Sequence, residues 1–163
     1  MRRLDLLVLA VAAMALAQSG EEKPAPPPPP QPIPFNHKQH AALGVKCLDC
    51  HAIRKPGFAA GIPQEPTCMG CHMTVKTDSP AIRKLTEFYK AKKPVPWVKV
   101  YRVPDYVWFS HKVHMKKSTC ETCHGAVAGR SVLTREKPIG MASCMACHDE
   151  AEAPNECNTC HNP

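Results

Sequence analysis

The residues with the clearest chemistry in this 163-residue chain are its ten cysteines, which form five pairs with one spacing. In every pair two residues separate the thiols, and a histidine directly follows the second cysteine. The five motifs are Cys47, Cys50 and His51; Cys68, Cys71 and His72; Cys120, Cys123 and His124; Cys144, Cys147 and His148; and Cys157, Cys160 and His161. This pattern is typical of covalent c-type haem attachment, in which the thiols bind the vinyl groups and the histidine binds the iron.

Disulfide frameworks, zinc sites and redox-active dithiols also use paired cysteines. Disulfides leave the adjacent histidine unexplained, and five units of two cysteines and one histidine do not divide into tetrahedral zinc sites. A redox dithiol is expected once or twice in a chain. We therefore expect five covalently bound c-type haems (heme c). Because the chain has only nine aromatic residues, we also expect the haems to serve as its core.

Four histidines lie outside the motifs, in two matching strings that we expect to be short helical turns. The strings are Phe35-Asn-His37-Lys-Gln-His40 and Phe109-Ser-His111-Lys-Val-His114. Side chains three positions apart on a helix point in directions about 60° apart, so one turn could present two imidazoles to two different irons. These four residues are candidate second axial ligands, and the alternative is that they are solvated surface residues.

The second half of the chain lacks one imidazole. Three haems with two imidazole ligands each would need six histidines, and this half has five. The remaining iron could bind a methionine thioether, which raises its potential, or keep an open position for a small molecule. The candidates are Met115, Met141 and Met145. Met141 directly follows the turn Pro138-Ile139-Gly140 and precedes an attachment motif.

These strings and motifs resemble the class III multihaem cytochromes c, and residues 109–161 are similar to a small trihaem member of that class. The resemblance implies that His111 ligates the haem of Cys120 and that His114 ligates the haem of Cys144. By the same logic His37 serves the Cys47 haem and His40 serves the Cys68 haem. The third distal histidine of the trihaem proteins is absent here, and Met141 lies near its place, which makes it the candidate ligand of the Cys157 haem.

Over nearly the whole chain the arrangement also resembles the pentahaem cytochrome subunit of alternative complex III, a bacterial quinol oxidoreductase. That likeness is carried by Ala60-Gly61-Ile62-Pro63, by Cys68-Met69-Gly70-Cys71-His72, and by Trp97-Val98-Lys99-Val100 through Pro104-Asp105-Tyr106 to His114. The resemblance implies membership of a membrane complex that oxidises quinols.

The N-terminal segment predicts that the protein is exported from the cytoplasm. Arg2 and Arg3 precede an apolar run from Leu6 to Leu16, and Ala15-Leu16-Ala17 matches a secretory cleavage site. The alternative is a membrane anchor, although a span needs roughly 20 apolar residues. We expect a signal peptide over residues 1–17, a Pro-rich tether over 18–34, and a periplasmic or other extracytoplasmic location.

The folded part is predicted to begin near Phe35 and to be mainly irregular with short α-helices. A dihaem module is expected over residues 35–76, a linker over 77–108 and a trihaem module over 109–163. Within the linker, Ser79 and Pro80 begin an amphipathic helix that ends at Lys93 and Pro94, and residues 97–103 favour an extended stretch. The linker aromatics Trp97, Tyr101, Tyr106 and Trp108 are expected to pack against the haems.

The combined pattern predicts an electron-transfer protein rather than an enzyme, because bis-imidazole irons exchange electrons with little change in coordination. The alternative is a reductase of nitrite, hydroxylamine or peroxide, or a haem sensor, acting at the haem that lacks a histidine. The charge of +7 suggests nucleic acid, but roughly ten haem propionates would offset it, so we expect redox protein partners and no nucleic acid. Lys90, Lys92, Lys93, Lys112, Lys116 and Lys117 could steer acidic partners or form a solvated face.

Overall fold

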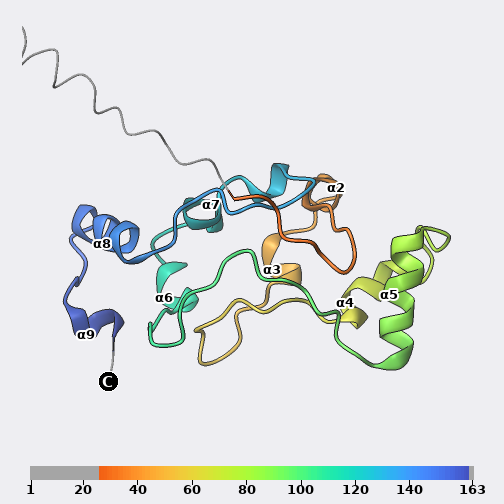
Figure 1. Ribbon diagram of the computed structural model, residues 1–163, viewed down its shortest axis with the longest axis horizontal. Helices are drawn as coiled ribbons and strands as arrows, with labels where there is room; N and C mark the ends of the chain where they lie inside the picture. Colours follow the sequence, from red (N-terminus) through yellow and green to blue (C-terminus); the bar gives the residue numbers. More distant parts are fainter. Residues whose placement is uncertain (1–25, 162–163) are drawn as a thin grey trace, which may run out of the picture.

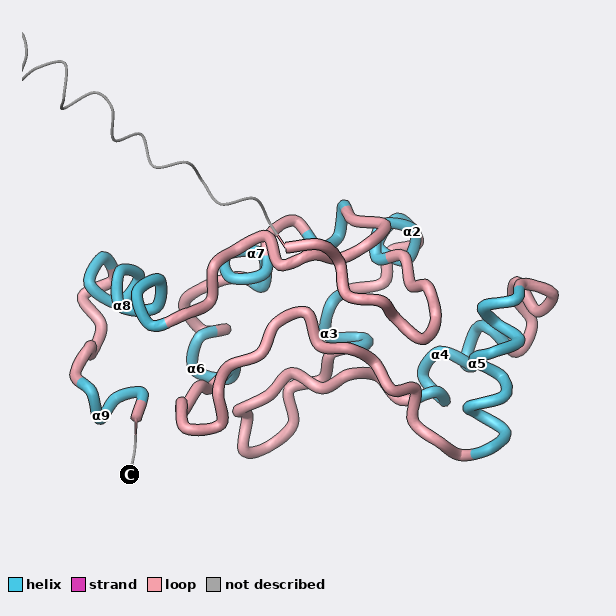
Figure 2. The backbone as a smooth tube through the Cα atoms, in the orientation of Figure 1, coloured by secondary structure: helices cyan, strands magenta, loops and turns pink. Residues whose placement is uncertain are grey.

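The computed structural model describes residues 26–161 and consists mostly of irregular segments joined by short helices (Figures 1 and 2). The helices are α2 (His37–Ala42), α3 (Cys47–Cys50), α4 (Glu65–His72), α5 (Pro80–Ala91), α6 (His111–His114), α7 (Cys120–His124), the 3₁₀ turn η1 (Val127–Gly129), α8 (Met141–Glu150) and α9 (Cys157–Cys160). No β-strand occurs in residues 26–161, where one isolated bridge joins Ile53 and Ala60. The prediction of an irregular chain with short α-helices is confirmed.

The helices are spread along an elongated molecule, although not in chain order (Figure 1). Helices α4 and α5 form one end, α3 and α7 lie towards the middle, and α8 and α9 form the other end. Both distal-histidine strings form the predicted helices, since α2 begins at His37 and α6 begins at His111. The attachment motifs are therefore spread along the length of the molecule.

Helix α5 matches the helix predicted in the linker. Ser79 is its N-cap, Pro80 occupies the first position, and Lys92 ends the helix in a left-handed conformation with φ of 52°. The segment 97–103 is not part of any strand. Its backbone is held by Gln31, whose side chain donates to the carbonyl oxygen of Val98 at 2.8 Å and accepts from its amide at 3.0 Å.

The apolar core of the described residues is small and lies where α4 packs against α5. Its buried members are Ile33, Met69, Leu85 and Val95. The end of the Pro-rich segment is thus part of the fold, because Ile33 is only 4% exposed. The other described parts of the polypeptide bury no large apolar side chain of their own.

Glu65 is a buried charge in this core, and its carboxylate accepts the backbone N–H of Val95 at 2.7 Å. Replacing Glu65 with alanine is expected to destabilise the fold by about 1–3 kcal/mol, because a buried donor loses its acceptor. Denaturant unfolding would measure this loss. Glu65→Gln is the matched control, since its amide oxygen can still accept, and equal losses in the two variants would contradict the explanation.

Among the helices of residues 26–161, none is long and apolar enough to cross a membrane. The predicted signal peptide at residues 1–17 and the first part of the tether lie outside the described residues.

Candidate haem-binding sites

Each pair of cysteines lies on one helical turn, on α3, α4, α7, α8 or α9. Residues at positions i and i+3 share a face of a helix, so both thiols of a pair can point to the same group. No disulfide joins any two of the ten cysteines, all of which lie in the described residues. Among residues 26–161, no three side chains of histidine, cysteine, aspartate or glutamate converge as a metal site built from protein alone would require.

The environment of four of the thiols also differs from that of a redox dithiol. Burial raises the pKa of the Cys50, Cys68, Cys120 and Cys123 thiols. Reactive dithiols instead have a lowered pKa, which keeps one sulfur as the nucleophilic thiolate.

The four candidate distal histidines each lie opposite the histidine of one attachment motif. In the first half, the ring centres of His37 and His51 are 6.5 Å apart, and those of His40 and His72 are 6.2 Å apart. In the second half the corresponding distances are 6.4 Å for His111 and His124 and 6.0 Å for His114 and His148. These are the same four pairs that the resemblance implies.

The distances between the paired rings fit one metal between them. A metal–imidazole bond is about 2 Å long and the ring centre lies roughly 1 Å beyond the bonding nitrogen, so two imidazoles on one metal have centres about 6 Å apart. Two pairs are also nearly parallel, with interplanar angles of 10° for His37 and His51 and 2° for His111 and His124. The residues present therefore fit four haem irons with two imidazoles each.

Backbone carbonyl groups fix the orientation of most of these rings. Seven histidines place Nδ1 between 2.6 and 3.3 Å from a carbonyl oxygen: His40, His51, His72, His111, His114, His148 and His161. Because a carbonyl oxygen only accepts, Nδ1 carries the proton and Nε2 keeps the lone pair that a metal needs.

His37 and His124 are not among these seven, and Nδ1 of His37 is buried without a hydrogen-bond partner in the described part of the chain. Burial lowers the pKa of His37 to about 4, with smaller contributions from His51 and His40. The imidazole is therefore neutral at pH 7, which is the form that binds metals.

The phenylalanine of each string clamps both of its histidines, a role that was not predicted. Phe35 stacks on His40 with ring centres 4.4 Å apart and meets His37 edge-on at 4.7 Å. Phe109 repeats this arrangement at 4.3 Å from His114 and 4.8 Å from His111. The signal in the sequence was the same residue type at the same position of both strings.

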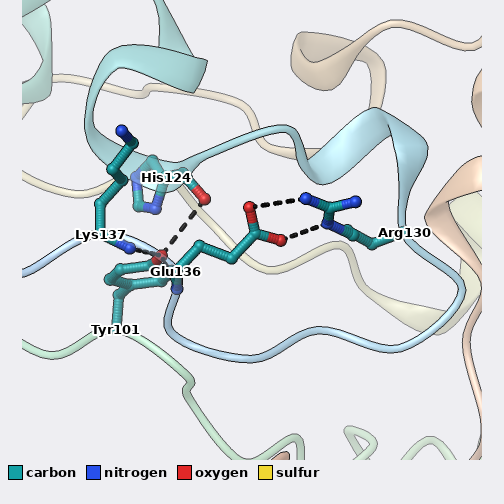
Figure 3. A network of polar contacts seen from close by, with 5 residues as sticks. All are labelled: Tyr101, His124, Arg130, Glu136 and Lys137. Carbon is teal, nitrogen blue, oxygen red and sulfur yellow. Dashed lines mark hydrogen bonds and ion pairs between the residues drawn. The ribbon is translucent and has the colours of Figure 1, made fainter. Parts of the chain in front are cut away.

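Tyr101 positions His124 through the contacts shown in Figure 3. Its ring meets the His124 imidazole edge-on at 4.7 Å, and its hydroxyl donates to the His124 carbonyl oxygen at 3.2 Å. The same hydroxyl accepts the backbone N–H groups of Glu136 at 2.9 Å and Lys137 at 3.2 Å. Glu136 also forms an ion pair with Arg130, which lowers the pKa of Glu136. Tyr101 thus ties the linker to the loop that follows α7.

Replacing Tyr101 with phenylalanine is expected to lower the free energy of unfolding by about 1 kcal/mol, because three hydrogen bonds of one hydroxyl are lost. The midpoint potential of the haem expected at His124 should shift, and the other haems should keep theirs. Redox titration and denaturant unfolding would measure both effects. Tyr89→Phe on α5 is the matched control, and an equal response of the two variants would contradict this role.

His161 lies apart from the four imidazole pairs, since the other eight histidines are already matched with one another. Its ring stacks on Tyr106 at 5.8 Å, and its Nδ1 lies 3.3 Å from the Tyr106 carbonyl oxygen. Met141 is the first residue of α8 and is 66% exposed, so its thioether is not held by packing within the polypeptide.

The other two candidate methionines have different surroundings. The Met115 sulfur lies 3.9 Å from the Cys120 sulfur. Met145 lies on α8 between the two cysteines of its motif.

Comparison with known proteins finds multihaem cytochromes. The family model described as cytochrome c3 matches residues 39–128, and the model described as cytochrome c7 and related cytochrome c matches residues 107–162. Together the two matched regions contain all five attachment motifs.

Two curated relatives support the same comparison. The multiheme cytochrome c subunit of menaquinone reductase from Nitratidesulfovibrio vulgaris (Hildenborough) is 31% identical over 156 residues, covering 78% of this chain and 74% of the relative. Cytochrome c3 from Desulfuromonas acetoxidans is 31% identical over 55 residues, covering 34% of this chain and 79% of the relative.

Proposed function

Because the chain belongs to the class III multihaem cytochromes c, we propose that it binds five haems and transfers single electrons between redox partners outside the cytoplasm. The haem irons supply the one-electron chemistry. The ten cysteines attach the haems, and His51, His72, His124, His148 and His161 are the proximal ligands. The distal ligands are His37, His40, His111 and His114, with Met141 at the fifth site.

The observation that carries this proposal is the set of four imidazole pairs with ring centres 6.0 to 6.5 Å apart. Two strong axial ligands hold an iron in the same coordination in both oxidation states, which favours rapid electron exchange and excludes small molecules. The chain thus orients each haem and tunes its potential through the hydrogen bonds of the imidazoles.

The proposal is tested by counting haems and identifying their ligands in the purified, exported protein. Mass spectrometry and the pyridine haemochrome spectrum are expected to give five haems per chain. Electron paramagnetic resonance of the oxidised protein should show low-spin irons with bis-imidazole signals. A colourless protein, or one with bound zinc or cystine crosslinks, would overturn the proposal.

We propose further that the chain works as a subunit of a quinone-linked respiratory complex at the membrane. The relative from Nitratidesulfovibrio vulgaris is a subunit of a menaquinone reductase, and the sequence resembles the pentahaem subunit of a quinol oxidoreductase. Solubilised membranes of the source cells, separated on a native gel and stained for haem, should contain this chain in a large complex. A chain found only as a free monomer would contradict the assignment.

The direction of electron transfer distinguishes the two resemblances. Reduction of the haems by a menaquinol analogue added to the purified complex supports a quinol oxidase role. Oxidation of the pre-reduced haems by a menaquinone analogue supports a menaquinone reductase role.

A second candidate function is a haem enzyme or sensor that acts at the Cys157 site. It is favoured by one observation, that among residues 26–161 no second histidine ring lies opposite that of His161. Carbon monoxide binding by the reduced, unaltered protein would separate the two functions. Substantial binding at one haem in five supports the enzyme or sensor, and no binding supports electron transfer.

If Met141 is the fifth ligand, Met141→Ala is expected to create carbon monoxide binding at one haem in five and to shift the midpoint potential of that haem. A thioether ligand raises the potential and closes the site, so its removal changes both properties. Met145→Ala, on the same helix, is the matched control. Unchanged spectra and potentials would exclude Met141.

A further inference from the structure

We propose that the two halves of the chain brace each other, each half holding the distal-histidine helix of the other through a backbone carbonyl group. The inference rests on the proposed ligation of haems by His37 and His111. It concerns the junction between the dihaem and trihaem modules. The attachment sites of Cys47 and Cys120, which lie nearest this junction, would then form one structural unit.

The bracing uses the same helix position in both repeats. The first N–H groups of any helix have no acceptor within the helix. Lys38 is the second residue of α2, and its N–H donates to the carbonyl oxygen of Arg130 at 2.9 Å. Lys112 is the second residue of α6, and its N–H donates to the carbonyl oxygen of Gly57 at 3.0 Å. The acceptor therefore lies in the opposite half each time.

Further contacts strengthen each brace. The carbonyl oxygen of Phe58, in the first half, lies 2.8 Å from Nδ1 of His111 and so orients this distal imidazole directly. The hydroxyl of Ser110 donates to the carbonyl oxygen of Gly57 at 3.4 Å. On the other side, α2 packs against η1 of the second half, and Figure 1 shows the two side by side.

The proximal residues also meet at this junction. The Cys120 side chain lies beside the Cys47 side chain of the first half. The imidazole of His124 lies near those of His111 and of His51 in the first half. The attachment sites of Cys47 and Cys120 are thus neighbours in space although 73 residues separate them in the sequence.

Gly57 allows the close approach of α6 in the brace formed by the Lys112 N–H and the Gly57 carbonyl oxygen. Its φ is +102°, and a Cβ atom added there would lie 2.6 Å from Cβ of Lys112. Gly57→Ala should therefore push α6 away and loosen His111, a ligand in the other half. Gly44→Ala is the matched control, because the φ of Gly44 is also positive, at +84°, and a Cβ atom there meets nothing within 4 Å.

The experiment compares the full-length holoprotein with its Gly57→Ala variant. One haem in five is expected to become partly high-spin and to bind carbon monoxide when reduced. The same signal should come from His111→Ala, and the double variant should not add a second affected haem. A low-spin spectrum in Gly57→Ala like that of Gly44→Ala would overturn the brace.

Amide hydrogen exchange in the unaltered, reduced protein tests both braces without a substitution. The amides of Lys38 and Lys112 should exchange at least roughly tenfold more slowly than in an unstructured peptide. The amide of Ala81, at the same position of α5, has no acceptor among the described residues and is the control. Rapid exchange at Lys38 or Lys112 would contradict the proposal. If instead the unaltered protein lacks bis-imidazole irons, the proposed function fails, whatever the amides show.

Discussion

His114→Ala is expected to convert one of the five proposed haem irons from low-spin to high-spin and to open it to carbon monoxide. The imidazole of His114 lies 6.0 Å from that of His148, and its Nδ1 lies 2.8 Å from the carbonyl oxygen of Ser110. No other histidine is free to replace it, because the remaining distal rings face other proximal rings. The site should therefore lose one of its two strong ligands.

The potential of this haem should change together with its spin state. Axial ligands set haem potentials over a range of about 0.8 V, so we expect a rise of at least roughly 0.1 V in His114→Met, where a thioether replaces an imidazole. Redox titration followed by optical and magnetic-resonance spectroscopy would measure the change. Lys116→Ala, an exposed position two residues further on, is the control. Five unchanged haems in His114→Ala would exclude His114 as a ligand.

A chain with Cys120→Ser and Cys123→Ser is expected to contain four haems and to lose more stability than any other variant considered. Removal of a buried aromatic side chain costs about 3–5 kcal/mol, and a haem at this site is larger. The surrounding residues come from several parts of the chain, because Tyr101 of the linker contacts His124 and Phe58 of the first half contacts His111. Their contacts would all be weakened together.

The matched control is Cys157→Ser with Cys160→Ser, which removes one haem at the end of the molecule (Figure 1). Helix α9 is tied to the chain by the Trp108 N–H, which donates to the Cys160 carbonyl oxygen at 2.7 Å, and by the His161 contacts with Tyr106. Mass spectrometry should count four haems in both variants, and thermal unfolding should show the larger loss for the Cys120 pair. Equal losses would mean that the site at the junction is not shared between the halves.

The sequence by itself determined the attachment chemistry, because covalent attachment needs two thiols and an imidazole at a fixed local spacing. It also predicted the helix over residues 80–91, since Ser79, Pro80 and the apolar period are local signals. The strings that begin at Phe35 and Phe109 form the expected helices for the same reason. In each case the structural outcome depends on residues within a few positions of one another.

Only the tertiary structure decided which distant backbone groups contact the helices and the imidazoles. Several contacts join residues that are 23 to 55 positions apart in the sequence. They are the contact of His111 with Phe58, the hydrogen bond of Lys112 to Gly57, and the three hydrogen bonds of Tyr101. Backbone carbonyl groups supply most of these contacts, and every residue type has one. No residue type in the sequence therefore indicates these contacts. The path of the chain alone determines which carbonyl group reaches which imidazole or amide.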